Sequence, residues 1–195
     1  MPSRRLVLIL GSVAVAAVLV IGLTQAGSKP GTTEKPKLSL AEQRRLLAGA
    51  PAPLADLHAQ ASRLLGGGRK AVRQRLRALA GHPIVINKWA SWCPPCRLEG
   101  PVFGRVGAKL GRQVAFVGLD GKDNTGDARR FLSQDPVSYP SYLDPDEAIA
   151  RMLKAGGFYP TTVFIDRHGN RTVHQGGYTD DAKLEQDIRR YAIHA

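Results

Sequence analysis

The residues best suited to chemistry in this sequence are Cys93 and Cys96, its only two cysteines, which enclose Pro94 and Pro95. Thiol-disulfide exchange needs one thiolate that attacks a disulfide and a second thiol that resolves the mixed disulfide. The Cys-x-x-Cys spacing supplies both groups within one turn of a helix. The pair therefore predicts a redox-active dithiol, and it excludes a disulfide that staples a long loop.

The segments around the cysteines predict a strand that leads into a helix. Residues 84–90 form an apolar, β-branched run typical of a central strand, and the helix is expected to extend to about residue 110. Unpaired N–H groups and the dipole at a helix N-terminus favour a thiolate. We therefore expect Cys93 to be the exposed attacking group with a lowered pKa, and Cys96 to be the shielded resolving group.

A zinc site is the structural alternative for the cysteine pair. Zinc needs four ligands, and without a second cysteine pair only His168 and His174 offer a suitable spacing. The two prolines and the flanking strand and helix are instead typical of a redox loop. We predict no metal and no cofactor other than the redox-active Cys93–Cys96 disulfide.

Strand and helix patterns alternate in the rest of this region. A second strand is expected at 114–120, helices at 127–133, 146–155 and 180–191, and a β-hairpin at 162–166 and 171–175. These elements predict an α/β fold in which helices flank a mixed central sheet.

Two motifs resemble the signatures of the TlpA/ResA branch of the thioredoxin superfamily. The first reads WASWCPPCR over residues 89–97 and continues to Glu99; the second reads PTTVFID over residues 160–166. Two ordered motifs are far more specific than a lone Cys-x-x-Cys. The resemblance covers about residues 82–193, and it implies a thioredoxin-like domain at 82–195 with thiol-disulfide oxidoreductase activity.

The second motif is expected to bind substrate. By the resemblance, Pro160 is a cis-proline opposite the cysteines, and together with Tyr159 and Thr161 it offers backbone groups to the substrate. The alternative is an ordinary loop proline, because most X-Pro bonds are trans.

The resemblance also gives supporting roles to residues around the cysteines. Trp92 is similar to the exposed tryptophan beside the nucleophile, with simple packing as the alternative. Glu99 matches an acidic position that tunes cysteine protonation, although solvated acids are also common near helix starts. Pro94 and Pro95 have no N–H to donate, which predicts a modest lowering of the Cys93 pKa and a reducing pair.

Three residues depart from the pattern of the family. Asn87 stands where thioredoxin has a buried Asp, so that carboxylate is missing. Lys88 stands where the branch usually has an aromatic residue, and its charge could lower the pKa of Cys93. Phe158 replaces a glycine two residues before the proline, which predicts a different substrate groove.

The N-terminus predicts export. Residues 6–23 are eighteen apolar or small residues without a charge, nearly long enough to span a bilayer, and Arg4 and Arg5 precede them on the expected cytoplasmic side. We therefore expect a signal anchor at 1–26, with cleavage after residue 26 as the alternative. A flexible linker is predicted at 27–38.

A helical extension is predicted at 39–81, ahead of the thioredoxin-like domain. A capping box of Ser39 and Glu42 starts its first helix, and helical patterns follow at 54–65 and 70–79. The resemblance gives this region no function, because the family usually has a β-hairpin there.

The net charge of +12 is concentrated in the N-terminal part of the chain. Residues 1–82 hold 13 Lys or Arg against 3 Asp or Glu, whereas residues 83–195 hold 15 against 13. Proximity to anionic lipid explains this asymmetry, and no nucleic-acid motif accompanies it. The basic run at 69–77 is interpreted as a solvated helix face, with a surface that binds lipid or a partner as the alternative.

Together these features predict an exported, membrane-tethered disulfide reductase. Its expected partners are extracytoplasmic protein thiols and disulfides, a membrane or exported electron donor, and the membrane itself through the N-terminal helix. A disulfide oxidase and a binding module with an inert disulfide are the alternatives, which reduction potential and thiol reactivity distinguish.

Overall fold

The computed structural model describes residues 35–195, of which Lys37–Ala195 form one compact unit. The expected anchor at 1–26 and most of the expected linker at 27–38 lie outside the described residues. Within residues 35–195, no helix is long and apolar enough to cross a membrane.

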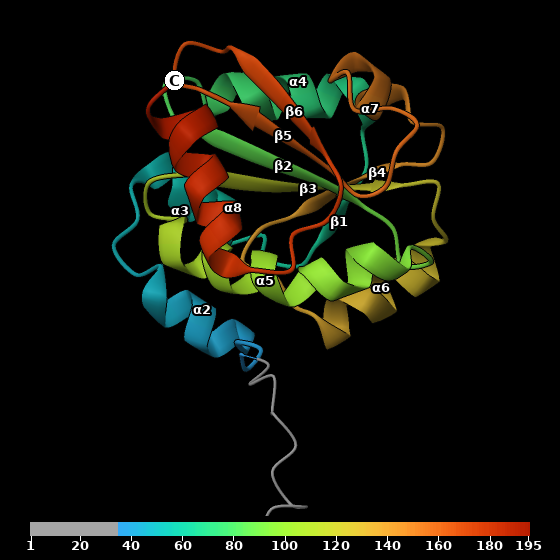
Figure 1. Ribbon diagram of the computed structural model, residues 1–195, viewed down its shortest axis with the longest axis horizontal. Helices are drawn as coiled ribbons and strands as arrows, with labels where there is room; N and C mark the ends of the chain where they lie inside the picture. Colours follow the sequence, from blue (N-terminus) through green and yellow to red (C-terminus); the bar gives the residue numbers. More distant parts are fainter. Residues whose placement is uncertain (1–34) are drawn as a thin grey trace, which may run out of the picture. The chain divides into compact units, whose positions relative to one another are not determined.

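A six-stranded mixed sheet lies at the centre of this unit, in the order β1-β4-β3-β2-β5-β6 (Figure 1). The strands are β1 (Leu64–Leu65), β2 (Ile84–Trp89), β3 (Ala115–Gly121), β4 (Ser141–Asp144), β5 (Thr161–Ile165) and β6 (Arg171–Gln175). The first four strands run parallel to one another, β5 pairs antiparallel with β2, and β6 pairs antiparallel with β5. Every residue of β2 and β3 is buried, as expected for central strands covered on both faces.

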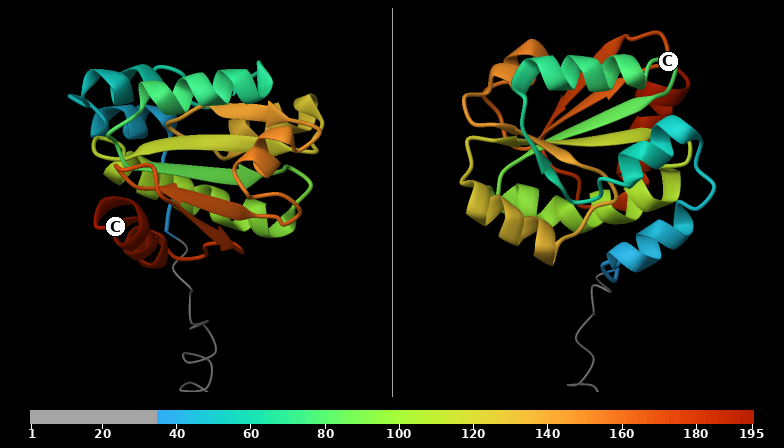
Figure 2. Two further views of the ribbon diagram at one scale, coloured as in Figure 1. Left: turned by 90° about the horizontal axis from the view of Figure 1, so that it is seen from above. Right: turned by 180° about the vertical axis from the view of Figure 1, so that it is seen from behind.

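Helices cover both faces of the sheet. They are α2 (Leu40–Leu46), α3 (Ala52–His58), α4 (Gly68–Ala78), α5 (Pro94–Leu110), α6 (Thr125–Gln134), α7 (Ala148–Met152) and α8 (Asp181–Ile188), which continues as a π-helical turn, η1 (Arg189–Ile193). One face carries α4 and α7, and the other carries α5, α6 and α8 (Figures 1 and 2). The predicted α/β fold with a mixed sheet and flanking helices is confirmed.

The N-terminal extension begins as the sequence predicts. The Ser39 hydroxyl accepts from the Glu42 N–H at 3.3 Å, and the Glu42 carboxylate accepts from the Ser39 N–H at 2.8 Å, which completes the capping box of α2. The buried Gln43 side chain donates to the carbonyl of Pro136 at 2.7 Å. The extension is therefore hydrogen-bonded to the α/β domain.

The helix predicted at 54–65 is wrong beyond His58. Ser62 adopts a left-handed conformation with a φ of 55°, its N–H donates to the carbonyl of Tyr139 at 3.0 Å, and its hydroxyl donates to the carbonyl of Val137 at 3.0 Å. These bonds carry the chain along the sheet edge, where β1 pairs with β4. Edge pairing thus outweighs the helical spacing of the leucines.

Downstream elements follow the predictions with two differences. The hairpin forms β5 and β6, and the helix at 127–133 lies within α6, whose N-cap Asn124 accepts from two backbone N–H groups. The helix predicted at 146–155 is shorter, because α7 covers only Ala148–Met152. β4 was not predicted from the sequence.

Candidate active site

The two cysteines lie where a buried strand leads into a helix. Cys93 occupies the N-cap position of α5 and forms a disulfide with Cys96, with the two Cα atoms 5.3 Å apart. Pro94 and Pro95 fill the first two helical positions and have no N–H. The N–H of Cys96 therefore donates to the sulfur of Cys93, at 3.2 Å.

The expectation that Cys93 is exposed is wrong for this disulfide form. Cys93 is 2% exposed and Cys96 1%. Both cysteines belong to the hydrophobic core cluster, because the fully buried β2 delivers them to a helix that packs against the sheet. The first turn of α5 thus holds the whole disulfide inside the fold.

The peptide bond between Tyr159 and Pro160 is cis, as the second motif predicts. Pro160 directly precedes β5, and Thr161 pairs with Lys88 near the end of β2 that leads to the cysteines. A Cβ on Gly177 would lie 3.5 Å from Pro160 and 3.6 Å from the carbonyl oxygen of Pro95. The cis-proline loop and the first turn of α5 therefore meet around Gly177.

Not all of the second motif is open to a partner molecule. Thr161 is fully buried, and its hydroxyl donates to the carbonyl of Phe158 at 2.9 Å. The carbonyl of Pro160 accepts from the N–H of Gly176 at 3.0 Å. The side chain of Phe158, in contrast, is 47% exposed beside the loop.

Trp92 directly precedes Cys93, and its side chain is exposed: 53% of the residue is accessible to solvent. Its indole N–H donates to the carbonyl of Lys122 at 2.9 Å, and its ring centroid lies 5.0 Å from that of Tyr159. These contacts fix the orientation of the ring, and about half of the residue remains exposed. The expected exposed tryptophan beside the cysteines is confirmed.

Glu99 lies one turn after Cys96 and is fully buried, so it is not a solvated helix residue. One carboxyl oxygen accepts from the Tyr178 N–H at 3.2 Å, whereas the other has no hydrogen-bond partner. Burial raises its pKa to about 8, although the Tyr178 N–H and the Asn87 amide oppose the rise. Glu99 is therefore a buried acid that can exchange a proton near neutral pH.

Lys88 is fully buried behind the cis-proline loop. Its ammonium donates to the Glu147 carboxylate and to the carbonyl of Ala155 at 3.1 Å, and it lies 3.8 Å from the centre of the Tyr159 ring. Burial would raise the pKa of Glu147, but hydrogen bonds from Lys88 and Lys122 outweigh it and hold this pKa at about 2. The charge of Lys88 is thus neutralised by Glu147.

Asp120, at the carboxyl edge of β3, is a second buried acid near the site. It is in register with Trp89, and neither carboxyl oxygen has a hydrogen-bond partner. Burial, with the charge of Asp123, raises its pKa to about 8. Asp123 itself accepts from the Ser91 hydroxyl at 2.7 Å and so binds the loop before the cysteines.

The histidines of the zinc alternative lie elsewhere. His168 is in the turn between β5 and β6, and His174 in β6 packs its ring 4.7 Å from that of Tyr178. Across residues 35–195, no three His, Cys, Asp or Glu side chains form a group that could hold a metal ion.

Comparison with known protein families shows to which family this chain belongs. The model of the AhpC/TSA family matches residues 49–172. The chain belongs to the AhpC/TSA family. The match includes the cysteine motif, the cis-proline and part of the extension, which agrees with the continuous packing of these parts.

Within this family the chain is similar to curated thiol-disulfide proteins. It is 29% identical over 109 residues to the thiol-disulfide oxidoreductase ResA of Halalkalibacterium halodurans, covering 54% of this chain and 60% of the relative. It is 37% identical over 93 residues to a thiol:disulfide interchange protein DsbE homolog of Paracoccus denitrificans, covering 47% and 48%. The chain thus spans less than two thirds of the length of these relatives.

Solved structures show the same fold. MTB dsbF, in its mixed oxidized and reduced forms, is 31% identical with a TM-score of 0.55, covering 60% of this chain and 85% of that one. A putative thiol:disulfide interchange protein DsbE from Chlorobium tepidum is 32% identical with a TM-score of 0.54, covering 60% and 84%. These likenesses establish the predicted thioredoxin-like fold.

Sequence reasoning missed Glu147 and Asp120 in this AhpC/TSA site. Glu147 contacts Lys88 from 59 positions away, and nothing local in the sequence indicates that pairing. The position of Asp120 could have indicated a role at the site. It is an acid near the carboxyl end of an apolar strand, and that strand pairs with the one that leads to the cysteines.

Proposed function

We propose that the protein is an exported, membrane-tethered thiol-disulfide oxidoreductase that reduces disulfides of extracytoplasmic proteins through the Cys93/Cys96 dithiol. The observation that carries the proposal is the disulfide at the start of α5, next to the cis peptide between Tyr159 and Pro160 and in front of the buried Glu99. The names of the ResA and DsbE relatives support the same class of reaction.

The reaction proceeds through a mixed disulfide. The Cys93 thiolate attacks one sulfur of a substrate disulfide, and the other substrate sulfur leaves as a thiolate that takes up a proton. Cys96, once deprotonated, attacks the sulfur of Cys93 and releases the first substrate thiol. Two electrons pass to the substrate, and an exported or membrane-bound dithiol must then reduce the Cys93–Cys96 disulfide for the next turnover.

Glu99 is the group placed to accept the proton of Cys96. It lies three residues after Cys96 on the same helix, and with a pKa near 8 it can accept or return a proton at neutral pH. Asn87 occupies the strand position beside it and cannot take a proton. In this proposal, Glu99 serves as the proton-handling carboxyl of the site.

The apolar surface around the disulfide suits a protein substrate. Among residues 35–195, three of the four large apolar side chains that are exposed belong to the segments around the site: Trp92, Leu98 and Phe158. Exposed apolar side chains beside a reactive group mark a surface that binds a partner. The backbone around Tyr159 and Pro160 is proposed to place the substrate chain, whereas Thr161, which is fully buried, is proposed to hold this loop in position.

The tether is proposed from residues 6–23 of the sequence, with Arg4 and Arg5 on the cytoplasmic side. A tethered domain meets disulfides and electron donors at the outer face of the membrane. Cleavage after residue 26 would release the same domain outside the cell.

Trapping tests the proposed chemistry. In Cys96→Ser, the mixed disulfide on Cys93 cannot be resolved, so substrate proteins are expected to accumulate as adducts that a reducing agent releases. The double variant Cys93→Ser with Cys96→Ser is the matched control and should trap nothing. Equal recovery from both variants would mean that the proteins bind without thiol exchange, as an inert binding module would.

The direction of the reaction is tested by the reduction potential. Because Pro94 and Pro95 donate no N–H, the thiolate of Cys93 is weakly stabilised and the potential is expected nearer about −270 mV than about −120 mV. The measurement is equilibration with glutathione buffers of known ratio, with the dithiol fraction read by alkylation. A potential above about −160 mV would assign the protein as a disulfide oxidase instead.

A further inference from the structure

A concave site lies at the end of β2 opposite the cysteines. It is a cavity of about 390 Å³ between α4 and the β5–β6 hairpin. Its floor is apolar and includes Leu76 of α4, the first residue of β2, Ile84, and the last residue of β5, Ile165. The size falls in the range of small-molecule pockets, about 300 to 1,000 Å³.

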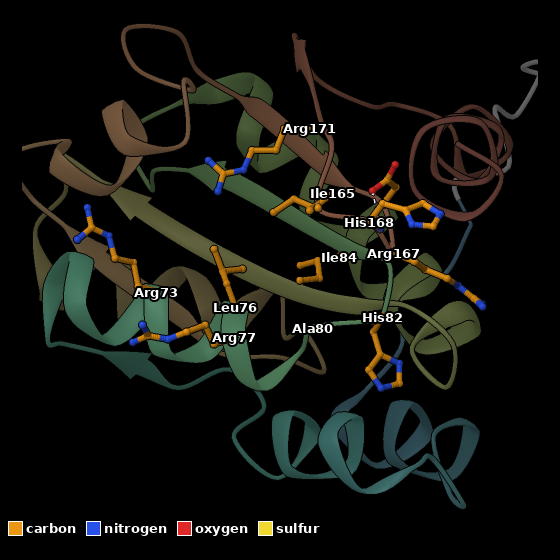
Figure 3. Close-up of a pocket in the computed structure, with 13 residues that line it drawn as sticks. Arg73, Leu76, Arg77, Ala80, His82, Ile84, Ile165, Arg167, His168 and Arg171 are labelled. Atoms are coloured by element: carbon orange, nitrogen blue, oxygen red, sulfur yellow. Dashed lines mark hydrogen bonds between the residues drawn. The ribbon is translucent and has the colours of Figure 1, made fainter.

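Four arginines line the rim of this cavity: Arg73, Arg77, Arg167 and Arg171. Figure 3 shows Arg73 and Arg77 on α4 and Arg171 on the other side of the apolar floor, with Arg167 at the other end of the cavity and its side chain directed outward. All four are exposed. The rim is therefore strongly basic over an apolar base.

These positive charges are not neutralised within residues 35–195. No carboxylate of the described chain forms a salt bridge with any of the four arginines. The single acid at the cavity, Asp166, accepts from the N–H groups of His168 and Asn170 at 2.8 Å, and from the Asn170 amide at 2.7 Å. Its oxygens are thus engaged in closing the hairpin turn.

The hydrogen bonds that the rim arginines form go to uncharged acceptors, so they do not neutralise the positive charge. Arg73 donates to the sulfur of Met152 at 3.2 Å, and Arg171 donates to the carbonyl of Met152 at 3.4 Å. Arg75, the next arginine of α4, points elsewhere and binds the hydroxyl of Tyr142 and the side chain of Gln60. The guanidinium groups at the cavity therefore have donors free for an anion.

We propose that this cavity binds a small organic anion that carries a phosphate or carboxylate group on a compact apolar body. Guanidinium groups bind both oxyanions through paired N–H donors, and the floor formed by Leu76, Ile84 and Ile165 takes the apolar body. A purely inorganic anion would leave this floor in water. A flat lipid surface would reach the rim without filling the concavity.

The test uses phenyl phosphate as the probe and the full chain in phosphatidylcholine nanodiscs, with binding measured by saturation-transfer NMR. We expect a dissociation constant below about 1 mM. Inorganic phosphate lacks the apolar body that the floor would bury, and benzyl alcohol lacks the anion that the guanidinium groups would bind, so each should bind at least about tenfold more weakly. Equal binding of inorganic phosphate would overturn the proposal in favour of a solvated basic face.

Two variants separate the charge from the cavity. The double variant Arg77→Ala with Arg167→Ala should weaken phenyl phosphate binding about tenfold or more. Ala80→Trp keeps every charge but fills the cavity, and it should abolish binding. Arg129→Ala removes one exposed arginine of α6 and should change nothing. Binding that survives Ala80→Trp contradicts the proposal.

Two further controls complete the design. Circular dichroism and urea midpoints should show that each variant folds, and reduction of a disulfide substrate should be unchanged because Cys93 lies at the other end of β2. Flotation of the nanodisc-embedded chain with phosphatidylglycerol vesicles tests the membrane as occupant. Vesicle binding that needs Arg77 and Arg167, without binding of phenyl phosphate, would assign the rim to a lipid surface and reject the small-ligand site.

Discussion

Glu99 combines complete burial with a carboxyl oxygen that has no hydrogen-bond partner, so its protonation is coupled to folding. Its pKa is about 8 in the folded protein against an ordinary value of 4.5. Between these pH values the folded state holds a proton that the unfolded state has released. The stability that Glu99 contributes is therefore complete below pH 4.5 and is lost as the pH rises toward 8.

The substitution Glu99→Gln tests this coupling. Glutamine keeps an oxygen for the Tyr178 N–H but cannot ionise, so the variant should gain stability relative to the natural protein as the pH rises from 5 to 8. The expected gain is on the order of 1 kcal/mol per pH unit. Urea unfolding of the disulfide form at pH 5, 6.5 and 8 measures it. Glu185→Gln, at an exposed pair with Lys109, is the control. If the free energies of unfolding of Glu99→Gln and the natural protein changed in parallel with pH, the assignment would be contradicted.

Lys88 and Glu147 form a buried ion pair that supports Tyr159 beside the disulfide. Lys88→Met leaves the Glu147 carboxylate buried without its main partner, so it should lower the free energy of unfolding by about 3 kcal/mol. This is the low end of the loss expected for buried pairs, because Lys122 still contacts Glu147. The double variant Lys88→Met with Glu147→Gln should be more stable than Lys88→Met alone. A double-mutant cycle in urea measures the coupling, and strictly additive losses would contradict it.

Local motifs were sufficient for the residues that lie close together in the chain. Cys93, Cys96 and Trp92 share one motif, and Pro160 stands at the head of another, so their types and spacing predicted their positions. Glu147 could not be found this way, because it reaches Lys88 only through the folded position of α7. The exposure of Cys93 was predicted wrongly. A position at a helix N-terminus favours a charged thiolate, but it does not determine how far the surrounding core buries the side chain.

The first turn of α5 controls how well a thiolate on Cys93 is stabilised. Pro95 stands at the second helical position, where an N–H would point at the N-cap side chain. Pro95→Ala supplies that donor, so the pKa of the Cys93 thiol should fall and the reduction potential should become less negative. The pH dependence of alkylation of the reduced protein measures the pKa. Pro94→Ala is the matched control with a smaller expected shift, and equal shifts would contradict the geometry.

Strands proved harder to predict than helices, for reasons visible in two of them. β4 has only four residues, two of them polar, and it gives no clear periodicity. β1 has two residues, Leu64 and Leu65, whose spacing from Leu54 and Leu57 is equally helical. β4 forms between β3 and β1, and β1 pairs only with β4, at the edge of the sheet. Such pairing depends on partners about 77 positions apart, which no local pattern records.

At the scale of the whole molecule, the extension is part of the core. Leu54 and Leu57 of α3 are fully buried in the same cluster as the sheet, and the His58 ring lies between the carbonyls of Ser138 and Gly111, at 3.1 and 2.9 Å. Leu57→Ala should therefore lower the free energy of unfolding by about 2 to 5 kcal/mol. Urea unfolding measures this, and the exposed Leu46→Ala is the control. A loss below about 0.5 kcal/mol would mean that the extension folds apart from the domain.

The last prediction concerns where the domain works. As an α-helix, residues 6–23 would extend about 27 Å, close to the hydrocarbon thickness of about 30 Å, and Arg4 and Arg5 should stay on the cytoplasmic side. The full chain is then expected in the membrane pellet after carbonate washing, with the cysteine domain open to protease added outside. A soluble protein that begins near residue 27 would show signal cleavage instead. A domain protected from protease in intact spheroplasts would contradict export itself, and with it the proposed partners, because disulfides persist mainly outside the cytoplasm.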